Sequence, residues 1–435
     1  EPTSIQEKAI PVILERNDVL GVAQTGTGKT AAFAIPMLTK LNPRDFAAQC
    51  LVLCPTRELS TQVANEIRKL ARYQQNIKVV VLCGGQSIGP QIGSLEHGGH
   101  IIVGTPGRIK DHLRKKTLSL SRVNTVVLDE ADRMLDMGFY DDIEHIIGHT
   151  PDERQTLLFS ATYPPKIKTL SASFQKSPVE VSVESTHSNQ HIAQHLFICD
   201  GNNKLDALPR LINHFSVESA VIFCNTIKEV KSVCEFLQNT GYSAKALHGD
   251  LEQRDRDQVL VQFSNRSCSF LVATDVAARG LDIDELPAVI NYELPRDPEI
   301  YIHRIGRTGR AGNEGLALGL FTHKEKYKLE AIQDYQKTDL GFEAAESLPA
   351  DKNSNLKPSM VTLCIAGGRK DKVRPGDILG ALTGNGGVTS DVVGKINIFD
   401  FSGYVAVKRE ASKQALQQLQ EGKIKGRKFK VRLLR

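Results

Sequence analysis

Two short motifs, each at the end of a continuous apolar run, constrain the fold of this chain most. Residues 23–30 read AQTGTGKT and follow the apolar run at residues 19–22. Residues 129–132 read DEAD and follow the apolar run at residues 125–128. A glycine-rich turn between a strand and a helix lets backbone N–H groups face a phosphate, and a carboxylate at a strand end can face Mg²⁺. Together the motifs predict an α/β domain that binds and hydrolyses a nucleoside triphosphate.

The same alternation of strand and helix continues through most of the chain. Apolar runs that are continuous rather than alternating indicate strands buried in a parallel sheet. These runs are 19–22, 50–54, 78–82, 100–103, 125–128 and 156–159, then 195–199, 220–224, 243–247, 270–273, 288–291 and 315–321. The two series predict two doubly wound α/β lobes, residues 1–183 and 195–345, with residues 184–194 as the linker.

The last part of the chain has a different composition. Residues 358–435 carry 15 Lys and Arg against 6 Asp and Glu, whereas the remainder carries 40 against 44. A polar linker is predicted at residues 346–357. The strands and helix predicted beyond it are 360–365, 393–398, 404–407 and 429–433, and 411–420. This pattern indicates a small α+β domain, and its positive charge predicts a polyanionic partner, most simply nucleic acid.

The cysteines and the apolar runs bear on where the protein resides. The eight cysteines are scattered without a C-x-x-C pair. This favours reduced thiols in the cytoplasm over a zinc site or a disulfide framework. A spanning helix needs a run of about 18 apolar residues, and none is found. The chain starts at Glu1 without Met or an apolar leader, so no signal peptide is predicted and further residues are expected upstream.

Ten motifs in a fixed order make residues 1–345 resemble the DEAD-box ATP-dependent RNA helicases. The motifs are PTxIQ at 2–6, AQTGTGKT at 23–30, PTREL at 55–59, GG at 84–85, TPGR at 105–108, DEAD at 129–132, SAT at 160–162, QxxR at 253–256, ATDVAARGLD at 273–282 and HRIGRTGR at 303–310. The resemblance implies two RecA-like lobes. It also implies ATP hydrolysis coupled to local separation of an RNA duplex, in which one strand is bent as the lobes close.

Residues of the first lobe are expected to hold ATP and Mg²⁺. The phosphates would lie in the P-loop, formed by Thr25, Gly26, Thr27, Gly28, Lys29 and Thr30. Lys29 would reach the β- and γ-phosphates, and Thr30 and Asp129 would hold Mg²⁺. Glu130 would orient and deprotonate the attacking water.

The resemblance assigns four further residues to the nucleotide. Gln6 would hydrogen-bond the adenine edge and so select ATP over GTP. An aromatic that stacks on the base in this family would lie upstream of Glu1. Asp282 would contact the ribose. Arg307 and Arg310 would be arginine fingers, each able to contribute roughly 10³–10⁵ in rate. Because they belong to the second lobe, hydrolysis would require closed lobes.

Other motif residues would contact RNA or couple it to ATP. Small residues, backbone amides and arginines suit phosphate contacts that carry no sequence information. The residues expected to contact the RNA backbone are Arg57, Gly85, Thr105, Arg108, Arg256 and Thr274. Ser160 and Thr162 would link the γ-phosphate to the RNA-bound state.

Residues 358–435 resemble a divergent RNA-recognition motif (RRM). Residues 401–407 partly match the RNP1 pattern, with Tyr404 at one base-stacking position. Ser402 and Cys364 stand where further aromatics are usual, so base stacking on this sheet is expected to be weak.

The basic end of the tail is predicted to bind RNA instead. Residues 422–435 contain seven Lys or Arg and no acid, and the RNA-binding candidates here are Lys423, Lys425 and Arg427. Three segments resemble the bacterial DbpA subfamily: 247–257, 374–384 and 422–426. That resemblance implies that the tail grips a hairpin of 23S ribosomal RNA near the peptidyl-transferase centre, on a precursor of the large ribosomal subunit.

Two other functions fit the same motifs. An ATP-gated clamp would close on RNA and seldom unwind it, although the intact Glu130, Arg307 and Arg310 favour turnover. A DNA helicase is disfavoured because RNA contact in this family involves 2′-hydroxyls.

Overall fold

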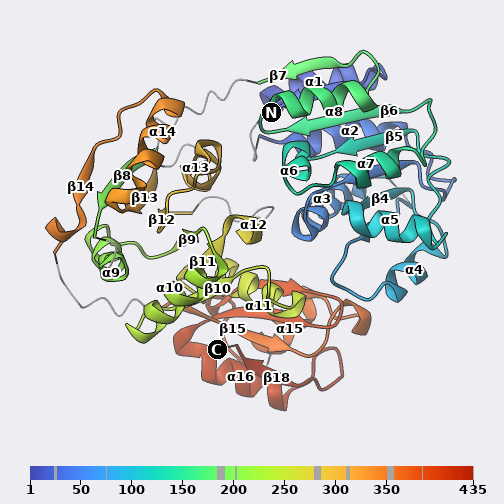
Figure 1. The fold of residues 1–435 in the computed structure, drawn as a ribbon. Coiled ribbons are helices and arrows are strands. Elements are labelled where there is room, and N and C mark those ends of the chain that lie inside the picture. The colour runs from blue at the N-terminus through green and yellow to red at the C-terminus, as the bar shows by residue number, and fades with distance from the viewer. Residues whose placement is uncertain are drawn as a thin grey trace. The chain divides into compact units, whose positions relative to one another are not determined.

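The computed structural model of the chain forms two compact units. Its described residues are 1–23, 27–74, 76–183, 192–200, 203–278, 286–309, 314–349, 357–384 and 386–434. Residues 1–183 lie in the first unit, and those from 192 onward lie in the second. The first unit is one lobe, and the second holds the other lobe together with a smaller domain (Figure 1). None of the described helices is long and apolar enough to cross a membrane.

A sheet of seven parallel strands forms the centre of the first lobe, in the order β3-β4-β2-β5-β6-β1-β7. The strands are β1 (Val19–Val22), β2 (Cys50–Leu53), β3 (Val79–Leu82), β4 (Ile101–Gly104), β5 (Thr125–Leu128), β6 (Gln155–Ser160) and β7 (Val179–Ser182). Every residue of β2, β4, β5 and β6 is buried. Their continuous apolar sequences follow from this burial on both faces.

Helices cover both faces of that sheet. The helices are α1 (Ser4–Leu14), α2 (Lys29–Lys40), α3 (Arg57–Leu70), α4 (Gly89–Leu95), α5 (Pro106–Arg114), α6 (Ala131–Asp136), α7 (Tyr140–Ile147) and α8 (Pro165–Phe174). Val52 of β2 packs in one apolar cluster with α1, α2 and α3. Its neighbours Leu51 and Leu53 pack in another with α5, α6, α7 and α8. The predicted doubly wound fold is therefore confirmed.

The second lobe repeats this architecture. Its seven parallel strands have the order β10-β11-β9-β12-β13-β8-β14, which matches the first sheet position by position. The strands are β8 (Ile192–Ile198), β9 (Ala220–Cys224), β10 (Ala244–Leu247), β11 (Phe270–Thr274), β12 (Ala288–Asn291), β13 (Gly315–Phe321) and β14 (Phe342–Ala344). The helices are α9 (Lys204–His214), α10 (Ile227–Asn239), α11 (Gln253–Ser264), α12 (Asp275–Ala278), α13 (Pro298–Ile305) and α14 (Lys326–Gln336).

The C-terminal domain is an antiparallel sheet with two helices, in the chain order β-α-β-β-α-β. Its elements are β15 (Met360–Ile365), α15 (Pro375–Thr383), β16 (Val393–Ile398), β17 (Gly403–Lys408), α16 (Ser412–Glu421) and β18 (Val431–Leu433). The four strands have the order β16-β17-β15-β18. Ile378 and Leu382 of α15 and Leu419 of α16 are buried in one core with the sheet. This is the predicted α+β fold.

The other face of the small sheet packs against α11 of the second lobe. Four buried side chains form this contact: Val261, Cys364, Tyr404 and Leu434. Asn265 Nδ2 donates to Thr362 Oγ1 at 3.2 Å, and Lys395 Nζ donates to Ser264 Oγ at 2.7 Å. The sheet face on which an RRM-like fold would stack RNA bases is therefore covered by this chain.

Candidate functional site

The turn before α2 is held by the start of α1. Gly28 has φ +87° and precedes Lys29, the first residue of α2. A side chain at Gly28 would collide with Gln6. Gln6 Nε2 donates to the Gly28 carbonyl at 3.1 Å, while Gln6 Oε1 accepts from Thr3 N at 3.0 Å. Both ends of the predicted adenine-reading amide are thus bound to backbone in this structure, the Nε2 end to the P-loop and the Oε1 end to the start of α1.

Lys29 and Asp129 are buried at the carboxyl edge of the first sheet. Lys29 is 6% exposed, and its Nζ has no hydrogen-bond partner among the described residues. Burial raises the pKa of Asp129 to about 6, although Lys29 opposes the rise. A buried ammonium without a partner is costly unless an anion pairs with it. The pair is suited to a phosphate on Lys29 and a cation on Asp129. Thr30, the next residue of α2, is half-buried.

Glu130 is held in place by a neighbour that the motif analysis did not identify. It has φ +52°, in the left-handed region, and is 4% exposed. Arg133 Nη1 donates to Glu130 Oε2 at 2.7 Å, and both side chains are 5% exposed. Glu130 N also donates to Asp129 Oδ1 at 3.0 Å. This ion pair orients the carboxylate that is predicted to activate water.

The third carboxylate of the DEAD motif binds the segment that follows β6. Asp132 Oδ2 accepts from Ala161 N and Thr162 N, both at 3.1 Å, and from Thr162 Oγ1 at 3.0 Å. Ser160 is fully buried, and its Oγ has no hydrogen-bond partner among the described residues. The structure therefore joins Thr162, one of the two predicted coupling residues, to the DEAD motif through Asp132.

The RNA-contact candidates of the first lobe follow strands of the other half of the sheet. Arg57 begins α3, and a side chain at Gly85, where φ is +71°, would collide with its guanidinium. Thr105 follows β4 and precedes α5. Arg108 Nη2 donates to the Gln86 carbonyl at 2.9 Å. These residues all lie at the carboxyl ends of β2, β3 and β4, where open α/β sheets bind ligands.

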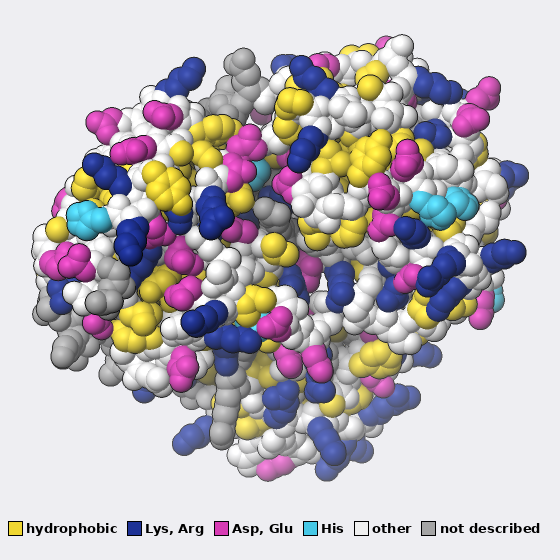
Figure 2. Space-filling view, in the orientation of Figure 1, with side chains coloured by type: hydrophobic (Ala, Val, Ile, Leu, Met, Phe, Trp, Pro, Cys, Tyr) yellow, Lys and Arg dark blue, Asp and Glu magenta, His cyan; other side chains and the backbone are white. Residues whose placement is uncertain are grey.

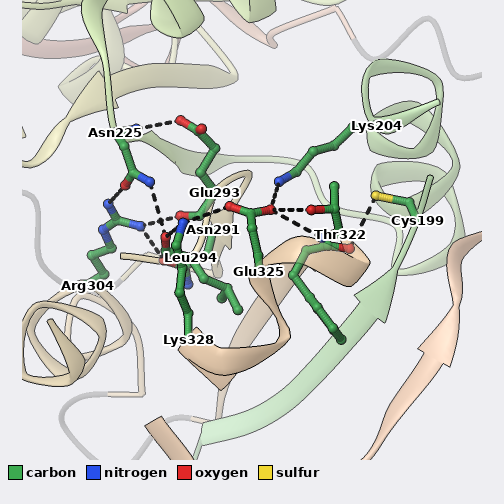
Figure 3. A network of polar contacts seen from close by, with 11 residues as sticks. Cys199, Lys204, Asn225, Asn291, Glu293, Leu294, Arg304, Thr322, Glu325 and Lys328 are labelled. Atoms are coloured by element: carbon green, nitrogen blue, oxygen red, sulfur yellow. Dashed lines mark hydrogen bonds and ion pairs between the residues drawn. The ribbon is translucent and has the colours of Figure 1, made fainter. Parts of the chain in front are cut away.

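In the second lobe, Arg304 binds the ends of three strands together. It is 2% exposed. Its Nε and Nη2 donate to the two Asp275 oxygens at 2.6 and 2.7 Å. Nη2 also donates to Asn225 Oδ1 at 2.9 Å, and Nη1 donates to Asn291 Oδ1 at 3.0 Å and to the Glu293 carbonyl at 2.7 Å (Figure 3). All five N–H groups of the guanidinium are thereby used.

The predicted second-lobe site residues surround that network. Thr274 lies at the end of β11, directly before Asp275, and Arg256 Nη2 donates to the Ala277 carbonyl at 2.7 Å. Arg307 follows α13, and its carbonyl accepts from Leu286 N at 3.1 Å. Four other predicted residues lie outside the described ones: Thr25, Gly26, Asp282 and Arg310.

The tail candidates divide into one buried and three exposed residues. Tyr404 is 2% exposed and contacts Phe399, with ring centroids 5.4 Å apart. Tyr404 therefore cannot stack on a base in this arrangement, because α11 covers that face of the sheet. This corrects the predicted base-stacking role of Tyr404. The exposed candidates are Lys423, Lys425 and Arg427. Lys425 Nζ donates to the Lys372 carbonyl at 2.9 Å, which brings a second basic loop beside them.

Motif reading missed the roles of Arg133 and Arg304. Both lie inside quoted motifs or beside them, but nothing in the sequence distinguishes a buried arginine from one that contacts a phosphate. Only the position of the residue in its helix could indicate burial. A charged residue on the core-facing side of a short helix such as α13 must find buried partners.

Comparisons with known proteins identify the family. The DEAD/DEAH box helicase family matches residues 3–170, the helicase conserved C-terminal domain matches 203–312, and the DbpA RNA binding domain matches 362–433. The ATP-dependent RNA helicase DbpA of Escherichia coli (strain K12) is 50% identical over 434 residues, covering 100% of this chain and 94% of that protein. DbpA of Bacillus subtilis (strain 168) is 38% identical, covering 99% and 94%.

The similarity to solved structures agrees with this family assignment. Dbp5 of S. cerevisiae bound to RNA and ADP BeF3 is similar with a TM-score of 0.72 and 32% identity, covering 81% of this chain and 90% of that chain. The match spans the two RecA-like lobes, and the third family match adds the RNA-binding tail. The chain therefore belongs to the DEAD-box ATP-dependent RNA helicases of the DbpA type, which are ATP-hydrolysing enzymes with a C-terminal RNA-binding domain.

Proposed function

We propose that this helicase acts in the cytoplasm on 23S ribosomal RNA during assembly of the large ribosomal subunit. Its tail would grip a hairpin near the peptidyl-transferase centre, and the lobes would separate a short duplex nearby. The observation that carries this proposal is the full-length similarity to DbpA, which includes the RNA-binding tail. Tethering by the tail raises the local concentration of the lobes at one RNA region without new contacts in the lobes.

Exposed loops of the tail, rather than its sheet, provide the RNA surface in this proposal. Two loops carry the exposed cations: Arg369, Lys370, Lys372, Arg374, Lys423, Lys425, Arg427, Lys428 and Lys430. Lys and Arg side chains are prominent on this domain in Figure 2. Phe401 is 70% exposed, and Lys370 N donates to the carbonyl of Asp400 beside it. Cations and one exposed ring are suited to phosphates and an unpaired base of a hairpin loop.

The nucleotide chemistry is assigned to residues at the edge of the first sheet. Lys29 would bind the β- and γ-phosphates, and Thr30 and Asp129 would hold Mg²⁺, which would polarise the γ-phosphate. The buried, unpartnered Lys29 Nζ supports this fit. Glu130 would orient and deprotonate the attacking water. No group of three or more His, Cys, Asp or Glu among the described residues could hold a metal, and Mg²⁺ in such sites takes most ligands from phosphate and water.

Three residues outside the P-loop complete the assignment. Gln6 would read the adenine edge, which requires its amide to leave the two backbone partners described above. Arg307, with Arg310, would stabilise charge on the γ-phosphate when the lobes close. Ser160 and Thr162 would report the nucleotide state to the RNA-contact loops, and the contact of Thr162 with Asp132 supports this role for Thr162.

A steady-state ATPase assay tests the ribosomal target. Activity is compared with total ribosomal RNA, with an unrelated RNA of equal length and without RNA. Strong stimulation by ribosomal RNA alone supports the proposal, and equal stimulation by both RNAs contradicts the ribosomal target. Lys425→Glu should raise the RNA concentration needed for half-maximal stimulation and lower the salt slope of RNA binding by about 1 or more. Lys413→Glu on α16 makes the same charge change away from the two loops and is the control.

A further inference from the structure

The two lobes place a lysine at the same point of the same fold. Because the strand orders match, β8 takes the place of β1 and β13 takes the place of β6. Equivalent backbone hydrogen bonds follow these strands. Ala23 N, after β1, donates to the Ser160 carbonyl at 3.0 Å, and Cys199 N, after β8, donates to the Phe321 carbonyl at 2.9 Å. The helix that follows starts with Lys29 in one lobe and with Lys204 in the other.

The partners of the two lysines differ. Lys29 Nζ has no hydrogen-bond partner among the described residues. Lys204 Nζ donates to Glu325 Oε2 at 2.8 Å and lies 5.3 Å from the Tyr292 ring centroid. The Lys204 and Glu325 side chains are 9% and 16% exposed, so solvent screens this ion pair little.

The Glu325 carboxylate accepts hydrogen bonds from the same kinds of donor that bind a phosphate. Besides Lys204, its carboxylate accepts from Lys328 Nζ at 2.8 Å, from Thr322 N at 3.1 Å and from Thr322 Oγ1 at 3.3 Å (Figure 3). Two ammonium groups, a backbone amide and a hydroxyl are also the donors that a P-loop and its surroundings offer to a nucleotide. Burial alone would raise the pKa of Glu325, but the two lysines outweigh it and hold the pKa below its ordinary value.

We propose that the start of α9 is the second lobe's counterpart of the P-loop, and that the Glu325 carboxylate occupies it in place of a phosphate. The second lobe is thereby closed to the phosphates of another nucleotide. The same carboxylate fixes Thr322 and the start of α14 to α9. Shortening Glu325 to alanine leaves two buried ammonium groups facing a vacated position, and a small oxyanion such as inorganic phosphate is the ligand that this position takes.

Hydrogen exchange of the full chain tests this, with inorganic phosphate as the probe and chloride of equal ionic strength as the reference. In the wild type, phosphate should leave exchange of the α9 peptide unchanged. In Glu325→Ala, phosphate at about ten times its dissociation constant should slow exchange of that peptide roughly tenfold. The triple variant Lys204→Met/Glu325→Ala/Lys328→Met, called the double-lysine variant below, removes both ammonium groups and should lose the effect.

Two outcomes overturn the proposal: α9 exchange in Glu325→Ala that is equal in both salts, or a phosphate effect that survives in the double-lysine variant. Because Glu325 also caps the turn His323–Glu325, Glu325→Ala can fail to fold in chloride. In that case recovery of the fold in phosphate supports the proposal, and equal failure in both salts overturns it.

Discussion

Replacing Arg304 with lysine tests whether one guanidinium holds the second-lobe site together. Arg304 is 2% exposed, and its five N–H groups reach five acceptors on Asp275, Asn225, Asn291 and Glu293. The cation also lies 5.0 Å from the Phe223 ring centroid. Lysine keeps the charge but has three donors on one atom, so at least two acceptors lose their partner.

The size of the effect follows from these contacts. A hydrogen bond to a charged group contributes about 1.5–3 kcal/mol, and breaking a buried ion pair costs about 3–5 kcal/mol. Since lysine can still pair with Asp275, we expect the lower end, about 3 kcal/mol of lost local stability. At about 1.4 kcal/mol per tenfold, amide exchange should become roughly 100-fold faster.

Hydrogen exchange measures this loss peptide by peptide. Peptides from α13 and from the β11–α12 segment should exchange faster in Arg304→Lys, while first-lobe peptides report the background. RNA-stimulated ATPase should fall as well, because Arg307 follows α13. Arg296→Lys, at an exposed arginine before α13, is the control and should change neither readout. Unchanged exchange in α13 and β11 would refute the reasoning.

Three further predictions concern the first-lobe site and the buried carboxylate of the second. Lys29→Ala should abolish RNA-stimulated hydrolysis and leave hairpin binding by the tail within about twofold, and normal turnover would show that the nucleotide assignment is wrong. Thr162→Val removes the hydroxyl donor to Asp132 Oδ2 and should lower strand displacement per ATP hydrolysed, measured in parallel with ATPase; an unchanged ratio would argue against coupling through Thr162. Because the pKa of Glu325 is held below its ordinary value of 4.5, the stability it contributes is present above that pH and is lost as the pH falls through its folded-state pKa. The unfolding midpoint of Glu325→Gln should therefore approach that of the wild type in acid, and a gap that widens there would contradict the ion pairs.

The fold could be predicted wherever burial imposes a pattern on the sequence. Strands Thr125–Leu128, Ala220–Cys224 and Ala288–Asn291 begin and end at the predicted residues, because strands buried on both faces are apolar throughout. The edge strands β7 and β14 were missed. In β7 only one residue is buried, and in β14 none is, so their sequences carry no apolar run.

The site was predictable as motifs but not as contacts. The positions of Lys29, Asp129 and Asp132 follow from strand ends and a P-loop, whose spacing is fixed by the chemistry. The commitment of Gln6 to the backbone of Thr3 and Gly28 depends on how α1 packs. The burial of Tyr404 depends on α11, which lies in another domain. Such contacts are set by packing between distant segments, for which a single sequence contains no period or spacing.

The matched lysines of the two lobes show what separates a binding position from a structural one in a repeated fold. Lys29 begins the helix after β1, which lies between β6 and β7, and Lys204 begins the helix after β8, which lies between the equivalent strands β13 and β14. Both lysines are less than 10% exposed. Burying an ammonium group is costly in either place, so each must have an anion. The second lobe supplies its own in Glu325, whereas no described residue hydrogen-bonds Lys29 Nζ. The difference in hydrogen-bond partners, rather than the fold or the lysine itself, is what supports the proposal that the first position binds a nucleotide.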